Sequence, residues 1–331
     1  MPHTLNTKRP RTVSIGGATY DLFLTMHTVS TGDDIVLRAG DKTKIDRVIE
    51  TCGGGACNTA VGLARLGCHA GFSGVVGADQ WGERLIATMT KEGVNTDSAT
   101  IVDGETSSFS IIMNLPNGDR TILYAPGANE HLHDVTFDVA KLESADCVYL
   151  NHLSDTACMI EDDIIKTLQE HTGTHLTWNP GGCQIARGYT DPSTQSLLAH
   201  TTLLLLNKEE ALAFTKALTV HDALSLLIAT GCQNVCITDG KHGVIAGDRK
   251  RRYVCPIIEN LHIVDTTGAG DAFGVGATWA LLLGEELPKA LIAGTLNASH
   301  VLGDIGAQRG LLTHTSMRSL LSDPKIRVET L

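Results

Sequence analysis

Short apolar runs alternate along most of the chain with longer segments whose apolar residues have a helical spacing. Strands that are apolar throughout are typical of a parallel sheet covered by helices on both faces. The alternation therefore predicts an α/β fold with a mainly parallel sheet. We expect strands at Thr12–Ile15, Gly71–Val76, Cys147–Leu150, His175–Trp178, Thr202–Leu206 and Asn234–Thr238. We expect helices near Ala56–Leu66, Gly82–Glu92, Glu161–Glu170, Lys208–Phe214, Val220–Ala229, Ala269–Leu283 and Pro288–Leu302.

Two regions interrupt this alternation. Residues from about 22 to 50 are polar, with single apolar positions scattered among them. Residues from about 98 to 124 contain two β-rich runs separated by Asn117-Gly118, a dipeptide that favours the tight turn of a β-hairpin. We expect both insertions to form one small β-sheet over the α/β core, and residues 1–331 to form a single domain.

The composition describes an acidic globular protein. Lys and Arg number 26 against 37 Asp and Glu, a net charge of −11, which argues against binding to nucleic acid or to an anionic membrane. The nine cysteines stand mostly beside apolar residues, as is typical of buried thiols. No apolar run is long enough for a signal peptide or a membrane span. We therefore expect a cytoplasmic protein.

The most informative motif is the run of small residues from Gly268 to Asp271, which opens directly onto an apolar helix. Backbone N–H groups at a helix N-terminus have no partner within the helix, and together with the helix dipole they favour an anion. The alternative is a tight turn with an acidic residue in the first turn of the helix. The small residues Gly274 and Gly276 farther along favour the anion site.

The run Asp265-Thr-Thr-Gly-Ala-Gly-Asp-Ala-Phe273 resembles the C-terminal signature of the ribokinase-like (PfkB) carbohydrate and nucleoside kinases. The earlier segment Gly53-Gly-Gly-Ala-Cys-Asn-Thr-Ala60 is similar to the glycine-rich substrate segment of that family. The resemblance extends from Val13 to about Leu312. It implies a ribokinase-like three-layer αβα sandwich with a small β-sheet lid, and an ATP-dependent kinase that phosphorylates a hydroxymethyl group of a sugar or nucleoside.

The resemblance also implies individual roles in catalysis. Asp271 matches the catalytic base, and Gly268, Ala269 and Gly270 match the anion hole that holds the transferring phosphoryl group. This division is chemically reasonable, because phosphoryl transfer depends chiefly on positioning and on stabilisation of charge. We expect the helix N-terminus to keep the carboxylate of Asp271 ionised.

Metal ligands are implied in two places. Asn207 and Glu210 match the NxxE motif of the family, in which Glu210 would hold Mg2+ through water; the alternative is a capping box at the start of a helix. Asp265 and the segment Gly306-Ala307 resemble the loops around a monovalent-cation site, which suggests K+ as a possible activator.

The nucleotide site is expected on the last third of the chain. Thr238, Gly240 and Gly243 belong to a loop that resembles the one near the ATP phosphates and ribose, although a simple hairpin turn would have the same residues. Asn297 matches the helix on the adenine side. Together these positions predict an ATP site beside the anion hole.

The acceptor is expected on the opposite side. Asp21 follows the first strand, where relatives place an acid that binds sugar hydroxyls; an ordinary turn carboxylate is the alternative. Asn58 would contact the same sugar, Gly53 and Gly54 would let the backbone come close to it, and Arg120 would reach over it from the hairpin.

The identity of the acceptor stays open. The segment lacks the lysine that we associate with ribokinase itself, which slightly favours a nucleoside or a less typical sugar. A nucleobase needs an apolar slot, for which Phe23 and Phe109 are candidates. In many relatives the lid pairs with a second subunit, so we expect a homodimer.

Two other functions are weighed against the kinase. A non-catalytic sensor of sugars or nucleosides would have no use for Asp271 and a complete glycine loop. An oxidoreductase is disfavoured because the Gly53–Gly55 segment lacks the third glycine of a dinucleotide fingerprint.

Overall fold

The computed structural model describes residues 9–26, 30–31, 34–35, 39–114, 120–133, 142–153 and 158–331. Its main element is a ten-stranded sheet, in which the strands from β7 to β13 are parallel and the remaining edge is antiparallel. All six strands expected from the apolar runs belong to this sheet. In spatial order the strands are β16 (Glu329–Thr330), β15 (Arg252–Cys255), β14 (Val244–Asp248), β13 (Asn234–Thr238), β12 (Leu203–Asn207), β11 (His175–Trp178), β10 (Cys147–Leu150), β1 (Arg11–Ile15), β6 (His69–Gly77) and β7 (Asn95–Val102).

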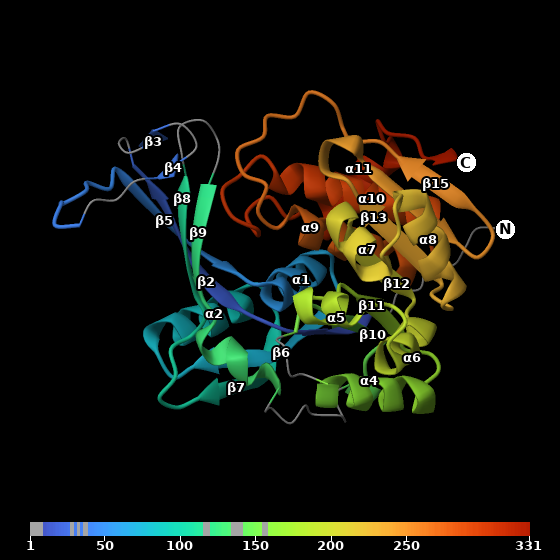
Figure 1. Cartoon of the computed structure of the whole chain (residues 1–331), viewed down its shortest axis with the longest axis horizontal. Coiled ribbons are helices and arrows are strands. Elements are labelled where there is room, and N and C mark those ends of the chain that lie inside the picture. The colour runs from blue at the N-terminus through green and yellow to red at the C-terminus, as the bar shows by residue number, and fades with distance from the viewer. Residues whose placement is uncertain are drawn as a thin grey trace.

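Helices cover both faces of this sheet (Figure 1). Leu204 and Leu206 of β12 pack in the cluster formed with α4 to α8, whereas Leu203 and Leu205 pack in the cluster formed with α9 to α11. Burial on both faces explains why the strands are apolar throughout, and the expected three-layer sandwich is confirmed. The helices are α1 (Gly55–Arg65), α2 (Gln80–Lys91), α4 (Cys158–Glu170), α5 (Gly182–Arg187), α6 (Pro192–His200), α7 (Lys208–Thr215), α8 (Val220–Ala229), α9 (Ala269–Leu282), α10 (Leu287–Val301), α11 (His314–Ser322) and the short 3-10 helices η1 (Gly127–His133) and η2 (Gly240–His242).

A second sheet forms the lid. Its strand order is β5 (Arg47–Gly53), β2 (Thr19–Thr25), β8 (Phe109–Asn114) and β9 (Arg120–Ala125), and a two-stranded ribbon joins β3 (Ser30–Thr31) to β4 (Asp34–Ile35). The lid projects from the large sheet beside α2 (Figure 1). The rings of Tyr20 and Phe109 pack on Trp81 of α2, with ring centroids 4.7 and 5.6 Å from it.

The bounds of the lid differ from those expected. Its first strand begins at Thr19, before the polar region starts, because residues 19–23 are largely buried in the lid itself. Residues 98–102 are part of β7 and pair with β6 in the large sheet, so the second lid segment begins after them. The expected Asn117-Gly118 turn lies outside the described residues.

Two further expectations concern the cysteines and the membrane. The eight cysteines whose side chains the structure describes are free, and seven of them are buried. Over the described ranges no single helix is both long and apolar enough to cross a membrane; α7 and α8 pass that test only as a pair, and they are bent by 61° at the break between them.

Candidate active site

The site lies where the carboxyl ends of the parallel strands meet the N-terminus of α9. A cavity of about 220 Å³ is lined there by residues that end or follow four consecutive strands, namely His152, Asn179, Asn207 and Thr238. Its other wall is the segment Gly268–Asp271. This edge is the usual ligand position in open α/β sheets, because polar side chains gather where the strands end.

Glycine at position 268 is required by the shape of this wall. Gly268 has a φ of +76°, a left-handed conformation that disfavours a side chain, and an added Cβ would overlap Ala307. Asp265 stabilises the preceding loop. Its Oδ1 accepts hydrogen bonds from Thr267 N (3.0 Å) and Thr267 Oγ1 (2.8 Å). Its Oδ2 accepts a hydrogen bond from Gly306 N (2.9 Å). Asp265 therefore positions the turn at Gly268–Gly270, and its role in a cation site stays a prediction.

Asp271 lies in the first turn of α9 and connects the cavity with the acceptor side. Its Oδ2 accepts a hydrogen bond of 2.8 Å from Asn58 Nδ2, and Asn58 Oδ1 in turn accepts one of 3.0 Å from Gln308 Nε2. Burial raises the pKa of Asp271; the bond from Asn58 and the nearby His152 oppose this shift, and Glu210 adds to it. The expectation that the helix N-terminus keeps Asp271 ionised stays a prediction.

Asp21 faces the same region from the lid. It is buried in β2, beside Ser110 of β8, and an added Cβ on Gly53 would overlap its carboxylate. Burial raises the pKa of Asp21 to about 6, the hydrogen bond from Ser110 opposes the rise, and the charge of Asp265 adds to it. Gly54 has a φ of +87° and lies against the backbone of Ala18. The two glycines thus let β5 come close to the acid.

The buried charge of Asp21 should lower the free energy of unfolding. Asp21→Asn should increase the free energy of unfolding by about 2–3 kcal/mol at about pH 8, because ionised Asp21 destabilises the folded state there. The folded pKa of about 6 lies above the unfolded value of 3.8, so the difference between variant and wild type should disappear as the pH falls towards 4. Urea unfolding at both pH values measures it. A variant less stable than the wild type at about pH 8 would contradict the assignment.

A second cavity of about 520 Å³ continues from the first, with which it shares Thr238, Thr266, Ala269, Gly270 and Phe273. Its lining is largely apolar, which suits a flat heterocycle. Gly240 and Gly243 line it as expected for a nucleotide loop. Its lining residues from η2 to α10 include Lys241, Val244, Ile257, Ile258, Leu261, Ile263, Thr295, Ala298, Ser299 and Leu302.

Asn297 does not belong to this cavity, which corrects the expectation for it. Its side chain is fully buried, Nδ2 donates to Ala272 O (2.8 Å) and Oδ1 accepts from Leu312 N (2.9 Å). One polar atom of Asn297 thus connects α10 to α9, and the other connects α10 to the segment that follows α10. The neighbouring residues Ala298 and Ser299 face the cavity instead.

Asn207 and Glu210 form the capping box that was the alternative interpretation of their motif. Asn207 Oδ1 accepts from Glu210 N and Glu210 Oε2 accepts from Asn207 N, both at 2.8 Å. Both residues nevertheless line the first cavity together with Asp271. The cap therefore fixes a carboxylate and an amide at the place where a hydrated divalent cation would find oxygen ligands.

Other expected acceptor residues have separate outcomes. The backbone of Arg120 begins β9, and its side chain lies outside the described residues. Phe109 packs on Trp81, away from Asp21, and so is not available as a base slot. Phe23 is buried and lies on the same face of β2 as Asp21, because residues two apart in a strand share a face.

His152, Asn179 and Gln308 were not expected from the sequence. Asn179 directly follows an apolar strand and His152 lies two residues after one, and these positions could have drawn attention to them. Gln308 is buried and reaches Asn58 from far along the chain, in a loop with no motif of its own. No sequence signal would have found it.

Comparison with known proteins identifies the family. The model of the pfkB family carbohydrate kinases matches residues 11–314. The chain belongs to this family. Its members are phosphotransferases with alcohol acceptors, so the expectation of such an enzyme is confirmed.

Individual relatives agree with this assignment. An uncharacterized sugar kinase of Archaeoglobus fulgidus is 30% identical over 76% of this chain and 98% of its own length. The ribokinase of Bacillus subtilis is 29% identical over 93% of this chain and 98% of its own length. The structure of Arabidopsis thaliana ribokinase complexed with ribose and ATP has a TM-score of 0.80, with 22% identity over 95% of this chain and 99% of that one, and it shows the shared fold.

Proposed function

We propose that this kinase transfers a phosphoryl group from ATP to a hydroxymethyl group of a sugar or nucleoside. One observation carries the proposal. Asp271 stands in the wall of the cavity that also contains Gly268–Gly270 and Glu210, while its carboxylate is hydrogen-bonded to Asn58 of the acceptor segment. A single carboxylate therefore lies between an anion-binding turn and the acceptor side.

The proposed reaction uses these groups directly. The acceptor oxygen forms a bond to the γ-phosphorus of ATP, the bond between that phosphorus and the bridging oxygen breaks, and ADP leaves. Asp271 takes the proton of the hydroxyl, and burial raises its pKa, which makes the carboxylate a stronger base. The N–H groups of Gly270 and Asp271 at the start of α9 would stabilise the charge on the transferring group.

The donor set at the cavity fits a magnesium ion. Glu210 and Asn207 would hold it through water, and when bound Mg2+ neutralises phosphate charge. The apolar second cavity supports ATP as the donor. A dependence on K+ rests on the resemblance at Asp265 alone.

The acceptor is proposed to be a sugar, with a nucleoside as the second candidate. Similarity to the B. subtilis ribokinase over nearly the whole chain supports a sugar. Buried Phe23 on the Asp21 face is the observation that favours a nucleoside, because an aromatic ring can pack against a base.

The deciding experiment is a measurement of ADP release with ATP and Mg2+ across sugars, sugar acids and nucleosides. One strong acceptor would establish the activity and its substrate together. ATP binding without release of ADP on any acceptor would instead support the non-catalytic sensor.

We also propose a cytoplasmic homodimer that assembles through the lid. Val48, Ile122, Leu123 and Tyr124 are each about half exposed on the edge strands β5 and β9 of this sheet, where apolar side chains can pack against a second copy. Light scattering at micromolar concentration should give the mass of a dimer. A monomeric mass would contradict the proposal.

A further inference from the structure

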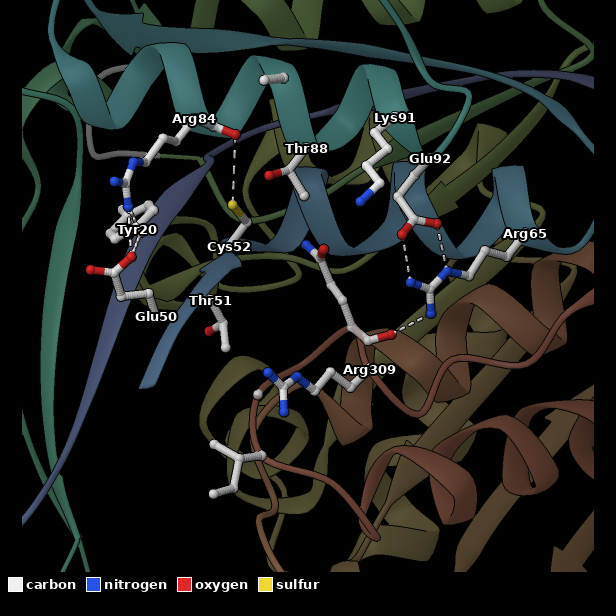
Figure 2. Close-up of a pocket in the computed structure, with 14 residues that line it drawn as sticks. Tyr20, Glu50, Thr51, Cys52, Arg65, Arg84, Thr88, Lys91, Glu92 and Arg309 are labelled. Carbon is white, nitrogen blue, oxygen red and sulfur yellow. Dashed lines mark hydrogen bonds and ion pairs between the residues drawn. The ribbon is translucent and has the colours of Figure 1, made fainter. Parts of the chain in front are cut away.

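A third cavity, of about 470 Å³, lies outside the active site and shares no lining residue with the two cavities described above. It is bounded by α1, α2, the end of β5 and the segment after α10 (Figure 2). Its volume is in the range of pockets that hold small molecules. The lid strand β5 and the loop that carries Gly306 both contribute to it, so it lies behind the acceptor side.

The walls of this cavity are rich in cations although the chain as a whole is acidic. Three arginines and one lysine line it, and one of the arginines comes from the wall opposite α1 and α2. Two carboxylates line it with them. The four cationic residues are Arg65, Arg84, Lys91 and Arg309, and the two acidic residues are Glu50 and Glu92.

Two of these cations are already engaged in the protein. Arg65 donates from Nε and Nη2 to both carboxylate oxygens of Glu92, each at 2.8 Å, and from Nη1 to the carbonyl of Gln308 at 2.6 Å. Arg84 donates from Nη1 to Glu50 (2.6 Å) and to the hydroxyl of Tyr20 (2.8 Å). The carboxylates are thus compensated by these two arginines.

Lys91 and Arg309 carry the excess positive charge. Both are exposed, and in the part of the chain that the structure covers neither makes an ion pair or a side-chain hydrogen bond. Figure 2 shows the amino group of Lys91 pointing into the cavity from α2 and the side chain of Arg309 extending from the loop on the opposite side. The charge of Lys91 also helps to lower the pKa of Glu92, which Arg65 already pairs. The cations of Lys91 and Arg309 on facing walls therefore leave net positive charge, which matches the negative charge of a phosphate group.

The floor supplies further polar groups. Thr51 lines the cavity, and its buried hydroxyl has no hydrogen-bond partner among the described residues. The paired carboxylates of Glu50 and Glu92 can accept hydrogen bonds from hydroxyl groups of a ligand. The combination of excess cations with neutralised acids suits a small phosphomonoester that carries hydroxyl groups.

We propose that this cavity is a second binding site, distinct from the active site, for a small phosphomonoester or free phosphate held between Lys91 and Arg309. Arg84 is the third phosphate-directed group, because among the described residues only its Nη1 donates hydrogen bonds. The proposal does not depend on which acceptor the kinase phosphorylates.

The position of the site connects it to catalytic residues. Arg309 follows Gln308, which donates to Asn58, the residue that holds Asp271. Gly306, in the same loop, donates to Asp265 beside the anion-binding turn. A ligand that bridges α2 and this loop therefore fixes the loop that supports both groups.

Trp81 provides the test with an internal reporter. Its ring lies under the guanidinium of Arg84, 5.9 Å from Arg84 Cζ, and against Tyr20, whereas Trp178 and Trp279 are buried elsewhere in the core. Titration of the whole protein with inorganic phosphate and with ribose 5-phosphate, at constant ionic strength in chloride and with ADP present, should give a saturable change in tryptophan fluorescence. ADP is included to fill the anion-binding turn of the active site.

The decisive comparison uses a double variant and a matched control. Lys91→Gln with Arg309→Gln should weaken binding about tenfold or more, because two charge-assisted contacts are lost. Lys166→Gln with Arg327→Gln removes the same charge from exposed positions outside all three cavities and should leave the affinity unchanged. Thermal unfolding of each variant verifies that it is folded.

The outcomes separate clearly. The proposal is overturned if wild type and double variant bind the anions with equal affinity, or if the control variant loses as much affinity as the double variant. It is also overturned if neither anion gives a saturable change in fluorescence up to about 10 mM. Tighter binding of ribose 5-phosphate identifies a phosphorylated metabolite as the ligand, and equal affinities identify free phosphate. Loss of ADP binding in the wild type would count against the proposed kinase function without affecting the comparison of variants.

Discussion

Replacement of Asp271 by asparagine should lower kcat by about 10²–10⁴-fold while the affinity for nucleotide changes little. Asparagine fills the same space at the start of α9, but its amide cannot accept the proton of the acceptor hydroxyl. The second cavity, proposed to hold the nucleotide, is lined by other residues, so its shape is retained. Steady-state turnover and ADP binding by calorimetry, measured on the same preparation, separate the two effects.

Asp162→Asn is the matched control, because Asp162 is exposed on α4 and lines none of the cavities. Its turnover should equal that of the wild type. If Asp271→Asn retained more than about a tenth of wild-type turnover, Asp271 would not be the base.

Gly268→Ala should reduce kcat/KM by about 10²–10³-fold, comparable to the loss of a main oxyanion donor. The new methyl group would overlap Ala307, and the positive φ of Gly268 disfavours any side chain. The turn can relieve both conflicts only by moving away from Ala307, which withdraws the N–H groups from the transferring phosphoryl. Kinetic constants and the affinity for a non-hydrolysable ATP analogue should both reveal the displaced turn.

Gly284→Ala isolates the contribution of backbone strain. Gly284 follows the other end of α9 with a φ of +81°, yet nothing lies within 4 Å of the position of an added Cβ. This variant should lose stability by about 1 kcal/mol and keep its activity. Equal activity of Gly268→Ala and Gly284→Ala would show that the turn does not bind the phosphoryl group.

The large sheet could be predicted because its strands are buried on both faces. Leu203 to Leu206 alternate between two cores, and such a run has few alternatives to a central parallel strand. The helices α5, α6 and α11 were missed, because stretches of six to nine residues show a helical period only weakly. The antiparallel strands β14 and β15 were also not expected. They have five and four residues, and each follows a polar loop.

The site was predictable where local backbone geometry defines it. Gly268–Gly270 and the Asn207–Glu210 pair are contiguous motifs whose conformation follows from their own residues. The partner of Asn58 was not predictable, because Gln308 reaches it only through the tertiary fold. Asn297 was misplaced for a related reason: its helix was correct, but the sequence does not say which side of a buried helix faces the nucleotide.

Asp21 belongs to the lid sheet. Asp271, Glu210 and the turn at Gly268–Gly270 belong instead to the large sheet and its helices. The lid strands make no ladder with the large sheet in the described part of the chain. Mutations in lid strands other than β5, which leads into α1, can therefore accumulate without disturbing the proposed nucleotide site. Evolution can diversify what such an enzyme accepts while inheriting unchanged the means by which it transfers phosphate.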